Sequence, residues 1–369
     1  MRVGIDGRLF AQPLAGVRRY VDRLCPALDE ILCDALFYVY TPHPVSFVGP
    51  SDRWTVRVDS EAPGMLRRNT FVWLKTRAAT LARRDDLDVY WAPGTFVPRA
   101  IPDVPVVSTV YDLTHLVAPG TMKARGLWQY RAFFARDLRR ADVVLAISQG
   151  TADRLATHLG VDARVVRPVV SPDFQPAEPE QIRSVLGAHG VQAPYLLSVA
   201  TWEPRKNLGR LVQAFSALAS DGTLSTHSLV LAGSRGWKYR DVNSALALAD
   251  QRVRVLDFVP DADLRALYSG ADAVVYPSIY EGFGLPVAEA RACGARVVTA
   301  DLPELREAGG TDAVYVEPTV DGIKNGIMAA LSQPARLPSR QPPASDAATG
   351  GVALAAALKD AASYVPARS

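Results

Sequence analysis

Apolar residues along the chain follow two alternating spacings. Short apolar runs, typical of buried strands, occur at 3–6, 36–40, 89–92, 104–110, 143–147, 164–166, 195–199, 228–232, 252–256, 273–276, 296–299 and 313–316. Helical spacing appears between them, at 16–31, 66–84, 123–140, 149–159, 207–219, 261–269, 286–293 and 320–332. This alternation predicts α/β architecture, with parallel sheets covered by helices on both faces.

A proline-rich stretch divides this pattern into two halves. Four prolines fall within residues 168–179, which predicts a linker. We expect a doubly wound N-terminal domain over 1–168, a linker over 169–192 and a doubly wound C-terminal domain over 193–334, facing a central cleft. A flexible segment over 335–350 and a C-terminal helix over 351–369 follow, with packing of this helix on the N-terminal domain as one option. Ligands of such sheets bind outside the carboxyl ends of the strands.

Composition excludes several classes of protein. A length of 369 residues suits two domains. The net charge is only +3, mildly basic in the first half and mildly acidic in the second, which argues against a nucleic-acid binder. No run of 18 apolar residues and no signal peptide is evident, and the three cysteines lack metal-ligand spacing. A cytoplasmic protein is expected.

One segment carries two glutamates on a predicted strand–turn–helix corner, Y276-P-S-I-Y-E-G-F-G-L-P-V-A-E-A-R-A-C-G294. Its glycines leave backbone amides bare, and Pro286 suits the first turn of a helix. The free amides and the helix dipole favour an anion. Glu281 and Glu289 can each accept hydroxyl hydrogens. The corner therefore predicts a site for a phosphorylated, polyhydroxylated ligand.

Two cations follow another predicted strand, in A200-T-W-E-P-R-K-N-L208. Arg205 and Lys206 are expected at the carboxyl end of that strand, where they would neutralise a diphosphate. Asn207 is a good N-cap for the following helix. Fixed cations at this place would stabilise a phosphate leaving group, whose negative charge grows as its bond breaks.

Segment 276–294 resembles the donor-binding motif of retaining nucleotide-sugar glycosyltransferases of family 4, in the glycogen-synthase-like GT-B superfamily. The E-P-R-K-N form resembles their mannosyltransferase-like branch. The resemblance covers nearly the whole chain and is strongest over 195–310. It implies the GT-B fold, with an acceptor-binding Rossmann-like domain over 1–168 and a nucleotide-sugar-binding Rossmann-like domain over 193–334. It also implies retaining transfer of a hexosyl group to a glycan or a polyprenyl diphosphate-linked oligosaccharide in surface polysaccharide synthesis. GDP-mannose is the favoured donor, with UDP- and TDP-sugars as alternatives.

The resemblance also implies roles for individual residues. These are Glu281, Gly282, Phe283, Gly284 and Leu285 for the donor sugar; Glu289 for the ribose; Arg205, Lys206 and Gly16 for the diphosphate; Phe258, Val259 and Pro260 for the nucleobase; Glu281, Asp112 and Tyr111 for catalysis; and His115 and Arg19 for the acceptor. The two cations would remove the need for a metal, so no metal or other cofactor is expected.

Two positions depart from the family pattern. Tyr111 stands where the family often has a histidine, and Thr201 stands where it commonly has an arginine. Tyr111 could donate to a sugar hydroxyl, with Asp112 orienting the acceptor, and Arg205 is the candidate replacement for the missing arginine. These departures leave open a non-catalytic glycosyltransferase-like binding protein.

Three further hypotheses concern activity and location. A nicotinamide-dependent dehydrogenase has similar alternation, but neither half carries G-x-G-x-x-G after a strand. A nucleotide-sugar epimerase has a similar two-domain shape. Segment 67–84 places Phe71, Leu74, Ala78 and Leu81 on one helical face among basic residues. That face predicts either peripheral contact with an anionic membrane or packing on the sheet.

Overall fold

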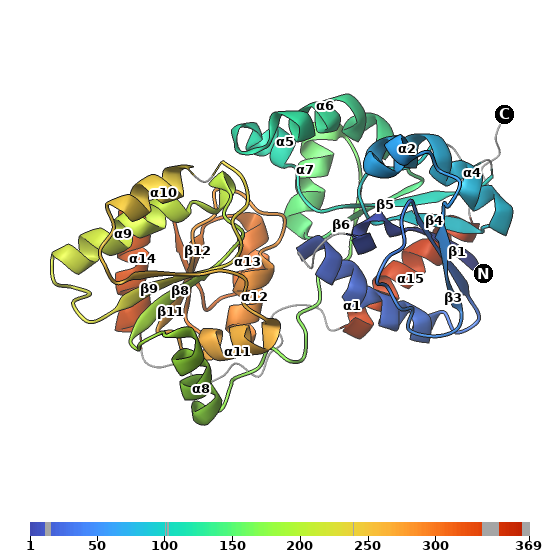
Figure 1. The fold of residues 1–369 in the computed structure, drawn as a ribbon. Coiled ribbons are helices and arrows are strands. Elements are labelled where there is room, and N and C mark those ends of the chain that lie inside the picture. The colour runs from blue at the N-terminus through green and yellow to red at the C-terminus, as the bar shows by residue number, and fades with distance from the viewer. Residues whose placement is uncertain (12–15, 100, 102, 239, 334–346, 364–369) are drawn as a thin grey trace. The chain divides into compact units, whose positions relative to one another are not determined.

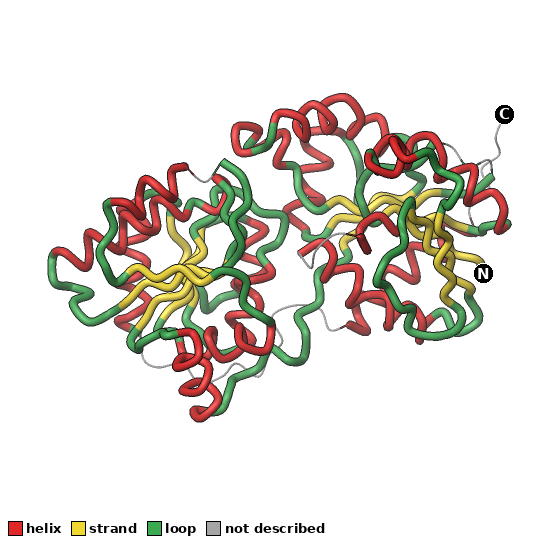
Figure 2. The backbone as a smooth tube through the Cα atoms, viewed as in Figure 1, coloured by secondary structure: helices red, strands yellow, loops and turns green. Residues whose placement is uncertain are grey.

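The computed structural model describes residues 1–11, 16–99, 101, 103–238, 240–333 and 347–363. The chain forms two compact units (Figure 1). Unit 1 comprises Met1–Leu113, Ala124–Val169 and Ser345–Ser369, and unit 2 comprises Thr114–Lys123 and Val170–Ala344. In each unit the strands lie between helices, shown in yellow and red in Figure 2. The predicted α/β architecture of two doubly wound units is confirmed.

Unit 1 contains a parallel sheet of seven strands in the order β3-β2-β1-β4-β5-β6-β7. The strands are β1 (Arg2–Asp6), β2 (Leu36–Thr41), β3 (Trp54–Val58), β4 (Val89–Ala92), β5 (Val106–Val110), β6 (Val143–Ala146) and β7 (Arg164–Val165). β4 and β5 are buried at every position, as expected for central strands covered on both faces. The β3 edge strand was not predicted.

The helices of unit 1 cover this sheet. They are η1 (Gly7–Ala11), α1 (Gly16–Ile31), α2 (Gly64–Arg68), α3 (Thr70–Trp73), η2 (Leu74–Ala78), α4 (Ala79–Ala82), η3 (Arg83–Asp85), α6 (Ala124–Leu138), α7 (Gln149–Leu159) and α15 (Ala347–Ser363). α1 and α7 have the predicted bounds.

The segment from α2 to η3 is interrupted where one continuous helix was predicted. Its apolar stripe belongs to the core of unit 1, with Leu74 and Ala78 fully buried and Phe71 and Leu81 packed against that core. Lys75, on the same segment, forms an ion pair with the buried Asp137. The stripe is therefore used for packing, and the interpretation as a membrane-binding face is wrong for it.

α15 packs along α1 within unit 1. Gly350 and Gly351 allow the close approach, because a Cβ on Gly351 would lie 2.5 Å from the Cβ of Ala27. Leu354 and Leu358 of α15 are fully buried. The helix begins at Ala347, inside the stretch expected to be flexible; the rest of that expectation, 335–346, lies outside the described residues.

Unit 2 contains a parallel sheet of six strands in the order β10-β9-β8-β11-β12-β13. The strands are β8 (Tyr195–Val199), β9 (Ser228–Ala232), β10 (Val253–Leu256), β11 (Ala273–Tyr276), β12 (Val297–Ala300) and β13 (Val314–Val316). β8 and β11 are neighbours, so the segments that follow them leave the sheet at the same edge.

The helices of unit 2 are α5 (Thr114–Val117), η4 (Pro119–Thr121), α8 (Pro179–His189), η5 (Pro204–Lys206), α9 (Leu208–Ser220), α10 (Arg240–Ala247), α11 (Asp261–Gly270), α12 (Leu285–Ala292), α13 (Pro303–Gly309) and α14 (Val320–Ser332). α8 lies inside the stretch expected to be a linker. That expectation is wrong over 179–189, because Pro179 begins a helix, where proline is tolerated.

Candidate functional site

The corner between β11 and α12 depends on a glycine. Gly284 precedes the helix with φ 98° and ψ 53°, in the left-handed region that favours glycine. A Cβ at this position would lie 2.5 Å from Leu305 Cδ2. Pro286 lies in the first turn of α12, as predicted. The sequence therefore forces a sharp turn directly before α12, in the loop that follows the fully buried strand β11.

Backbone donors line this turn. Among the described residues, the amides of Phe283 and Gly284 donate no hydrogen bond. Leu285 is the first residue of α12, where helix amides lack partners inside the helix. The Phe283 side chain is buried and fixes the turn from within. The corner thus presents backbone N–H groups next to the positive end of a helix.

Glu281 joins this corner to the cations that follow β8. Its Oε1 accepts a hydrogen bond from Lys206 Nζ at 2.6 Å, and its Oε2 accepts one from Arg205 Nη1 at 2.5 Å. The Tyr276 hydroxyl donates to Oε1 at 3.0 Å and accepts from Lys206 Nζ at 2.7 Å. Glu281 is 5% exposed, so this cluster is screened from water. The predicted association of these three charged residues with one site is present in the geometry.

The electrostatics of the cluster favour the charged form of Glu281. Burial would raise the pKa of this carboxyl, but the positive charges of Arg205 and Lys206 outweigh burial and lower its pKa to about 2. Burial raises the pKa of the Tyr276 hydroxyl well above its usual value, so the phenol keeps its proton and can donate. The cluster therefore holds one carboxylate beside two cations at neutral pH.

Asn207, which was predicted to cap α9 through its side chain, instead fixes the turn that carries Arg205 and Lys206. It lies at the N-cap position of α9 in the left-handed conformation, with φ 58°, and its side chain does not cap the helix. Instead, Nδ2 donates to the carbonyl oxygens of Pro277 and Pro318, at 3.0 and 2.9 Å. Ile279 N also donates to Arg205 O at 2.8 Å. These bonds join the η5 turn to the loop that carries Glu281.

Glu289 is a second buried carboxyl group on the same corner. It lies on α12 and is 1% exposed. Burial raises the pKa of the neighbouring Cys293 thiol, and the negative charge of Glu289 raises it further. Glu289 is thus close to Cys293 at the end of α12.

The predicted nucleobase residues follow β10 at the same edge of the sheet. Phe258 is 63% exposed, Val259 is buried, and Pro260 is the N-cap residue of α11. Gly233 N donates to the carbonyl oxygens of Leu256 and Asp257 at 3.1 Å, which holds the adjacent β9 corner against this loop. No hydrogen bond or aromatic contact joins the Phe258 side chain to the Glu281 cluster among the described residues.

Tyr111 and Asp112 follow β5 in unit 1, whereas the Glu281 cluster belongs to unit 2. The Tyr111 ring meets Tyr20 of α1 edge-to-face, with 5.5 Å between ring centres. Burial raises the pKa of the Tyr111 hydroxyl well above its usual value. Asp112 is half-buried. Tyr111 therefore keeps its proton, and packs against α1.

Three further predicted residues occupy different surroundings. His115, an expected acceptor residue, lies on α5 and is 5% exposed. Arg19 is half-buried on α1. Gly16 is the first residue of α1, and a Cβ there would meet no protein atom within 4 Å. The rest of its predicted loop, 12–15, lies outside the described residues.

An ion pair at the end of β1 was missed. Asp6 is fully buried and accepts from Arg8 Nε at 2.9 Å and from Arg8 Nη2 at 2.7 Å. Gly94 leaves room for it, since a Cβ there would lie 3.3 Å from Asp6 Oδ2. The signal in the sequence is D6-G7-R8 directly after a strand.

Glu203, which forms an ion pair with Arg205 at 3.5 Å, was also missed.

Two features are absent from the described part of the chain. No group of three or more His, Cys, Asp or Glu residues is placed to hold a metal ion there. No helix in the same residues has the length and apolar content needed to cross a membrane.

Comparison with known proteins identifies the family. Residues 14–174 match the family model described as Glycosyltransferase Family 4, and residues 186–346 match the one described as Glycosyl transferases group 1. The chain is 31% identical over 345 residues to O-antigen chain mannosyltransferase B of Escherichia coli, covering 86% of this chain and 87% of that protein.

Solved structures share the fold. Sucrose-phosphate synthase from Thermosynechococcus elongatus has a TM-score of 0.70 at 18% identity, with 97% of this chain and 94% of that chain covered. Alr3699/HepE of Anabaena, in complex with UDP-glucose, has a TM-score of 0.62 at 17% identity, with 98% and 95% covered. The chain belongs to the family 4 glycosyltransferases of the GT-B fold, on their mannosyltransferase-like branch.

Proposed function

We propose that this glycosyltransferase moves mannose from GDP-mannose, with retention of configuration, to a glycan or a polyprenyl diphosphate-linked oligosaccharide in surface polysaccharide synthesis. The observation that carries the proposal is the buried cluster in which Glu281 lies between Arg205 and Lys206. The choice of mannose draws on the similarity to the E. coli O-antigen mannosyltransferase.

Arg205 and Lys206 would hold the donor diphosphate. They follow β8 at the edge where ligands of parallel sheets bind. As the glycosidic bond breaks, negative charge grows on the departing diphosphate, and two fixed cations stabilise that charge without reorganisation. Their presence supports transfer that needs no divalent metal.

The corner before α12 would hold the sugar and the nucleoside. Glu281 and the amides of 283–285 would bind donor-sugar hydroxyls, and Glu289 would accept hydrogen bonds from the ribose hydroxyls. The loop at Phe258, Val259 and Pro260 would contact the nucleobase. Each assignment follows the family motif, and the residues belong to the segments that follow β10 and β11 of one sheet.

The proposed reaction is a substitution on one face of the donor sugar. The bond between the anomeric carbon and the diphosphate oxygen breaks, with its electron pair going to the diphosphate. The acceptor oxygen bonds to the anomeric carbon on the same face, and its proton passes to the departing phosphate oxygen. Tyr111 and Asp112 would orient the acceptor hydroxyl.

A UDP-sugar is the second candidate donor, favoured by the UDP-glucose complex of the similar Anabaena protein. The protein should be tested by thermal unfolding with GDP, UDP, TDP and ADP and their sugar conjugates, with and without magnesium. A nucleotide at about 100 times its dissociation constant stabilises a protein by roughly 2.7 kcal/mol, which gives a measurable shift.

A shift with GDP that is independent of magnesium and lost in Glu289→Ala would support the proposal. A shift of the unfolding temperature with UDP alone would indicate a UDP-sugar donor in place of GDP-mannose. The matching donor is then incubated with oligosaccharide acceptors, and the anomeric configuration of the product is read by NMR. Inversion at the anomeric carbon, or the absence of both nucleotide binding and transfer, would reject the proposed reaction.

A further inference from the structure

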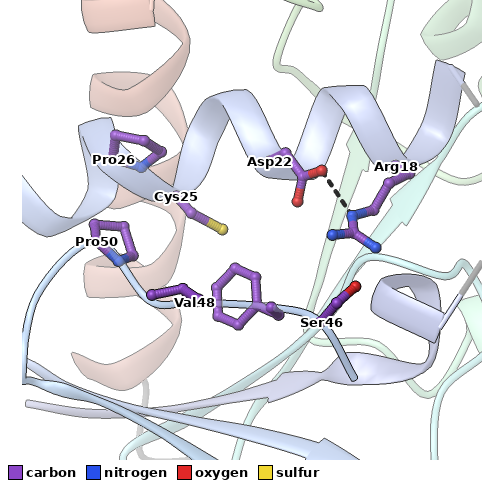
Figure 3. A pocket seen from close by; sticks show the side chains of 8 residues that line it. Arg18, Asp22, Cys25, Pro26, Ser46, Val48 and Pro50 are labelled. Carbon is purple, nitrogen blue, oxygen red and sulfur yellow. Dashed lines mark hydrogen bonds and ion pairs between the residues drawn. The ribbon is translucent and has the colours of Figure 1, made fainter. Parts of the chain in front are cut away.

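A pocket in unit 1 lies outside the site described above. It has a volume of about 300 Å³ and lies between α1 and the loop that follows β2. Arg18, Asp22, Cys25 and Pro26 of α1 form one wall, and Ser46, Phe47, Val48 and Pro50 form the other (Figure 3). This volume is at the lower end of the range for small-ligand pockets, so it suits a ligand of about one sugar ring.

The position of the pocket favours ligand binding. α1 belongs to the connection after β1, and the second wall begins after β2, which pairs with β1 in parallel. Both connections therefore leave the sheet from the carboxyl ends of neighbouring strands, the edge where parallel sheets bind their ligands, and Arg18, in the first turn of α1, is the α1 lining residue nearest to that edge.

One end of the pocket is polar but electrically balanced. Arg18 Nε donates to Asp22 Oδ2 at 2.6 Å, and Arg18 Nη1 donates to Phe10 O at 2.6 Å. Among the described residues, Arg18 Nη2 and Asp22 Oδ1 have no hydrogen bond. Figure 3 shows Arg18 on α1 opposite Ser46 on the loop. A hydrogen-bond donor (Arg18), a hydrogen-bond acceptor (Asp22) and the Ser46 hydroxyl therefore lie at this end of the pocket, and their net charge is zero.

The other end is apolar. Phe47 stacks on Phe10 with 4.0 Å between ring centres, which fixes the loop against the 3-10 turn that follows β1. The Cys25 side chain is buried, and burial raises the pKa of its thiol well above the usual value, so the thiol stays neutral. Val48 is 89% exposed at the rim. This end can accept the C–H face of a ring but no charge.

We propose that this pocket binds a neutral sugar residue of the acceptor glycan, an inference that rests on the proposed glycosyl transfer. Neighbouring hydroxyls of a pyranose can donate to Asp22 Oδ1 and accept from Arg18 Nη2, while the ring's C–H face packs on Val48 and Phe47. A phosphate is disfavoured, because Asp22 already neutralises the one cation and would repel a second anion. The occupant is therefore a sugar and not a lipid diphosphate.

Val48→Trp tests the assignment, because the side chain it replaces is exposed and the larger ring would close the mouth of the pocket. Leu248→Trp, at an 88% exposed position in unit 2, is the matched control. Loss of one stacked, hydrogen-bonded sugar should raise KM for the acceptor about tenfold, with KM for the donor unchanged. Asp22→Asn should give the same change without filling the pocket.

Direct binding separates this inference from the proposed function. Methyl α-mannoside and α-linked mannobiose are titrated without donor and followed by ligand NMR. Binding lost in Val48→Trp but retained in Leu248→Trp and in Glu281→Ala supports the sugar pocket even if no transfer is detected. Equal binding in Val48→Trp and Leu248→Trp, or binding of inorganic pyrophosphate that Val48→Trp removes, would overturn it.

Discussion

At the scale of single residues, Glu281 pairs with the same two cations that the diphosphate of a donor would contact. In the structure, its carboxylate neutralises Arg205 and Lys206, both of which are largely buried. A nucleoside diphosphate would bring its own negative charge to the same cations. We infer that the Glu281 carboxylate competes weakly with the diphosphate for Arg205 and Lys206. The same carboxylate is needed to bind the donor sugar.

Replacing Glu281 should therefore separate nucleotide binding from transfer. Glu281→Gln removes one negative charge beside the diphosphate site, so GDP should bind several-fold more tightly. Transfer should fall by about 100-fold or more, as when an enzyme loses a preorganised polar group. Calorimetric titration with GDP and initial rates of transfer measure the two effects.

The exposed Glu180 provides the matched control, since Glu180→Gln also removes one negative charge from unit 2. It should leave both quantities unchanged. Weaker GDP binding in Glu281→Gln would show that the carboxylate supports the diphosphate site and does not compete with it.

The same carboxyl should make the stability of unit 2 sensitive to acid. Its pKa is about 2 in the folded protein, against 4.5 for an ordinary glutamate. The unfolded chain therefore binds the proton at higher pH than the folded chain, and stability is lost as the pH falls from about 4.5 to about 2. The loss from this group should be about 3 kcal/mol.

Urea unfolding between pH 7 and pH 2 measures this effect. The free-energy difference between wild type and Glu281→Gln should shrink on acidification, since the wild-type carboxyl becomes protonated. A difference that is constant across this range would contradict the low pKa.

At the scale of elements, the corner between β11 and α12 requires Gly284. A side chain there would meet Leu305 at 2.5 Å and would strain a backbone with φ 98°. Gly284→Ala should therefore destabilise the protein by about 2 kcal/mol or more. The thermal stability of unit 2 and its affinity for GDP should both decrease.

Gly187 provides the control on another helix. A Cβ there would meet no atom within 4 Å, and the residue lies within α8. Gly187→Ala should be neutral or stabilising by up to about 1 kcal/mol. Equal stability of the two variants would show that the corner can relax around an alanine.

Burial determines which elements the sequence predicts well. β4, β8, β9 and β11 have the predicted bounds, because strands buried on both faces are continuous apolar runs. β3 was missed because it is an edge strand whose last two residues, Arg57 and Val58, are exposed. α8 was missed because the four prolines of residues 168–179 precede or begin it and are typical of a linker.

The candidate site shows a similar division. Glu281, Arg205 and Lys206 were predicted because each lies in a recognisable local motif. Their mutual contacts depend on β8 and β11 being neighbours, which local spacing does not show. The Asp6–Arg8 pair was missed since a buried ion pair and an exposed one look alike in sequence.

At the scale of the whole molecule, unit 1 is assembled from distant parts of the chain. α15, which follows all of unit 2 in sequence, packs on α1 and contributes fully buried leucines to unit 1. Each buried leucine stabilises a fold by about 1.5–3 kcal/mol. The stability of unit 1 therefore depends on residues 347–363.

Removal of residues from 347 onward should selectively destabilise unit 1. Hydrogen exchange should accelerate in α1, β4 and β5, which α15 contacts, and should stay slow in β8 and β11 of unit 2. Val352→Ser is the control, because Val352 is 55% exposed on α15. Unchanged protection of α1 in the truncated chain would contradict a stabilising role for α15.

The return of α15 to unit 1 has a consequence for biosynthesis. α1 leaves the ribosome early, but its partner helix follows only after unit 2 has been translated. At about 5–20 residues per second, this delay is on the order of half a minute. During that time Leu24 and Ala27, which are buried in the finished protein and lie next to Gly350 and Gly351 of α15, lack their final cover. The second unit can therefore complete its fold on the ribosome before the first, which makes nascent unit 1 a natural client for chaperones.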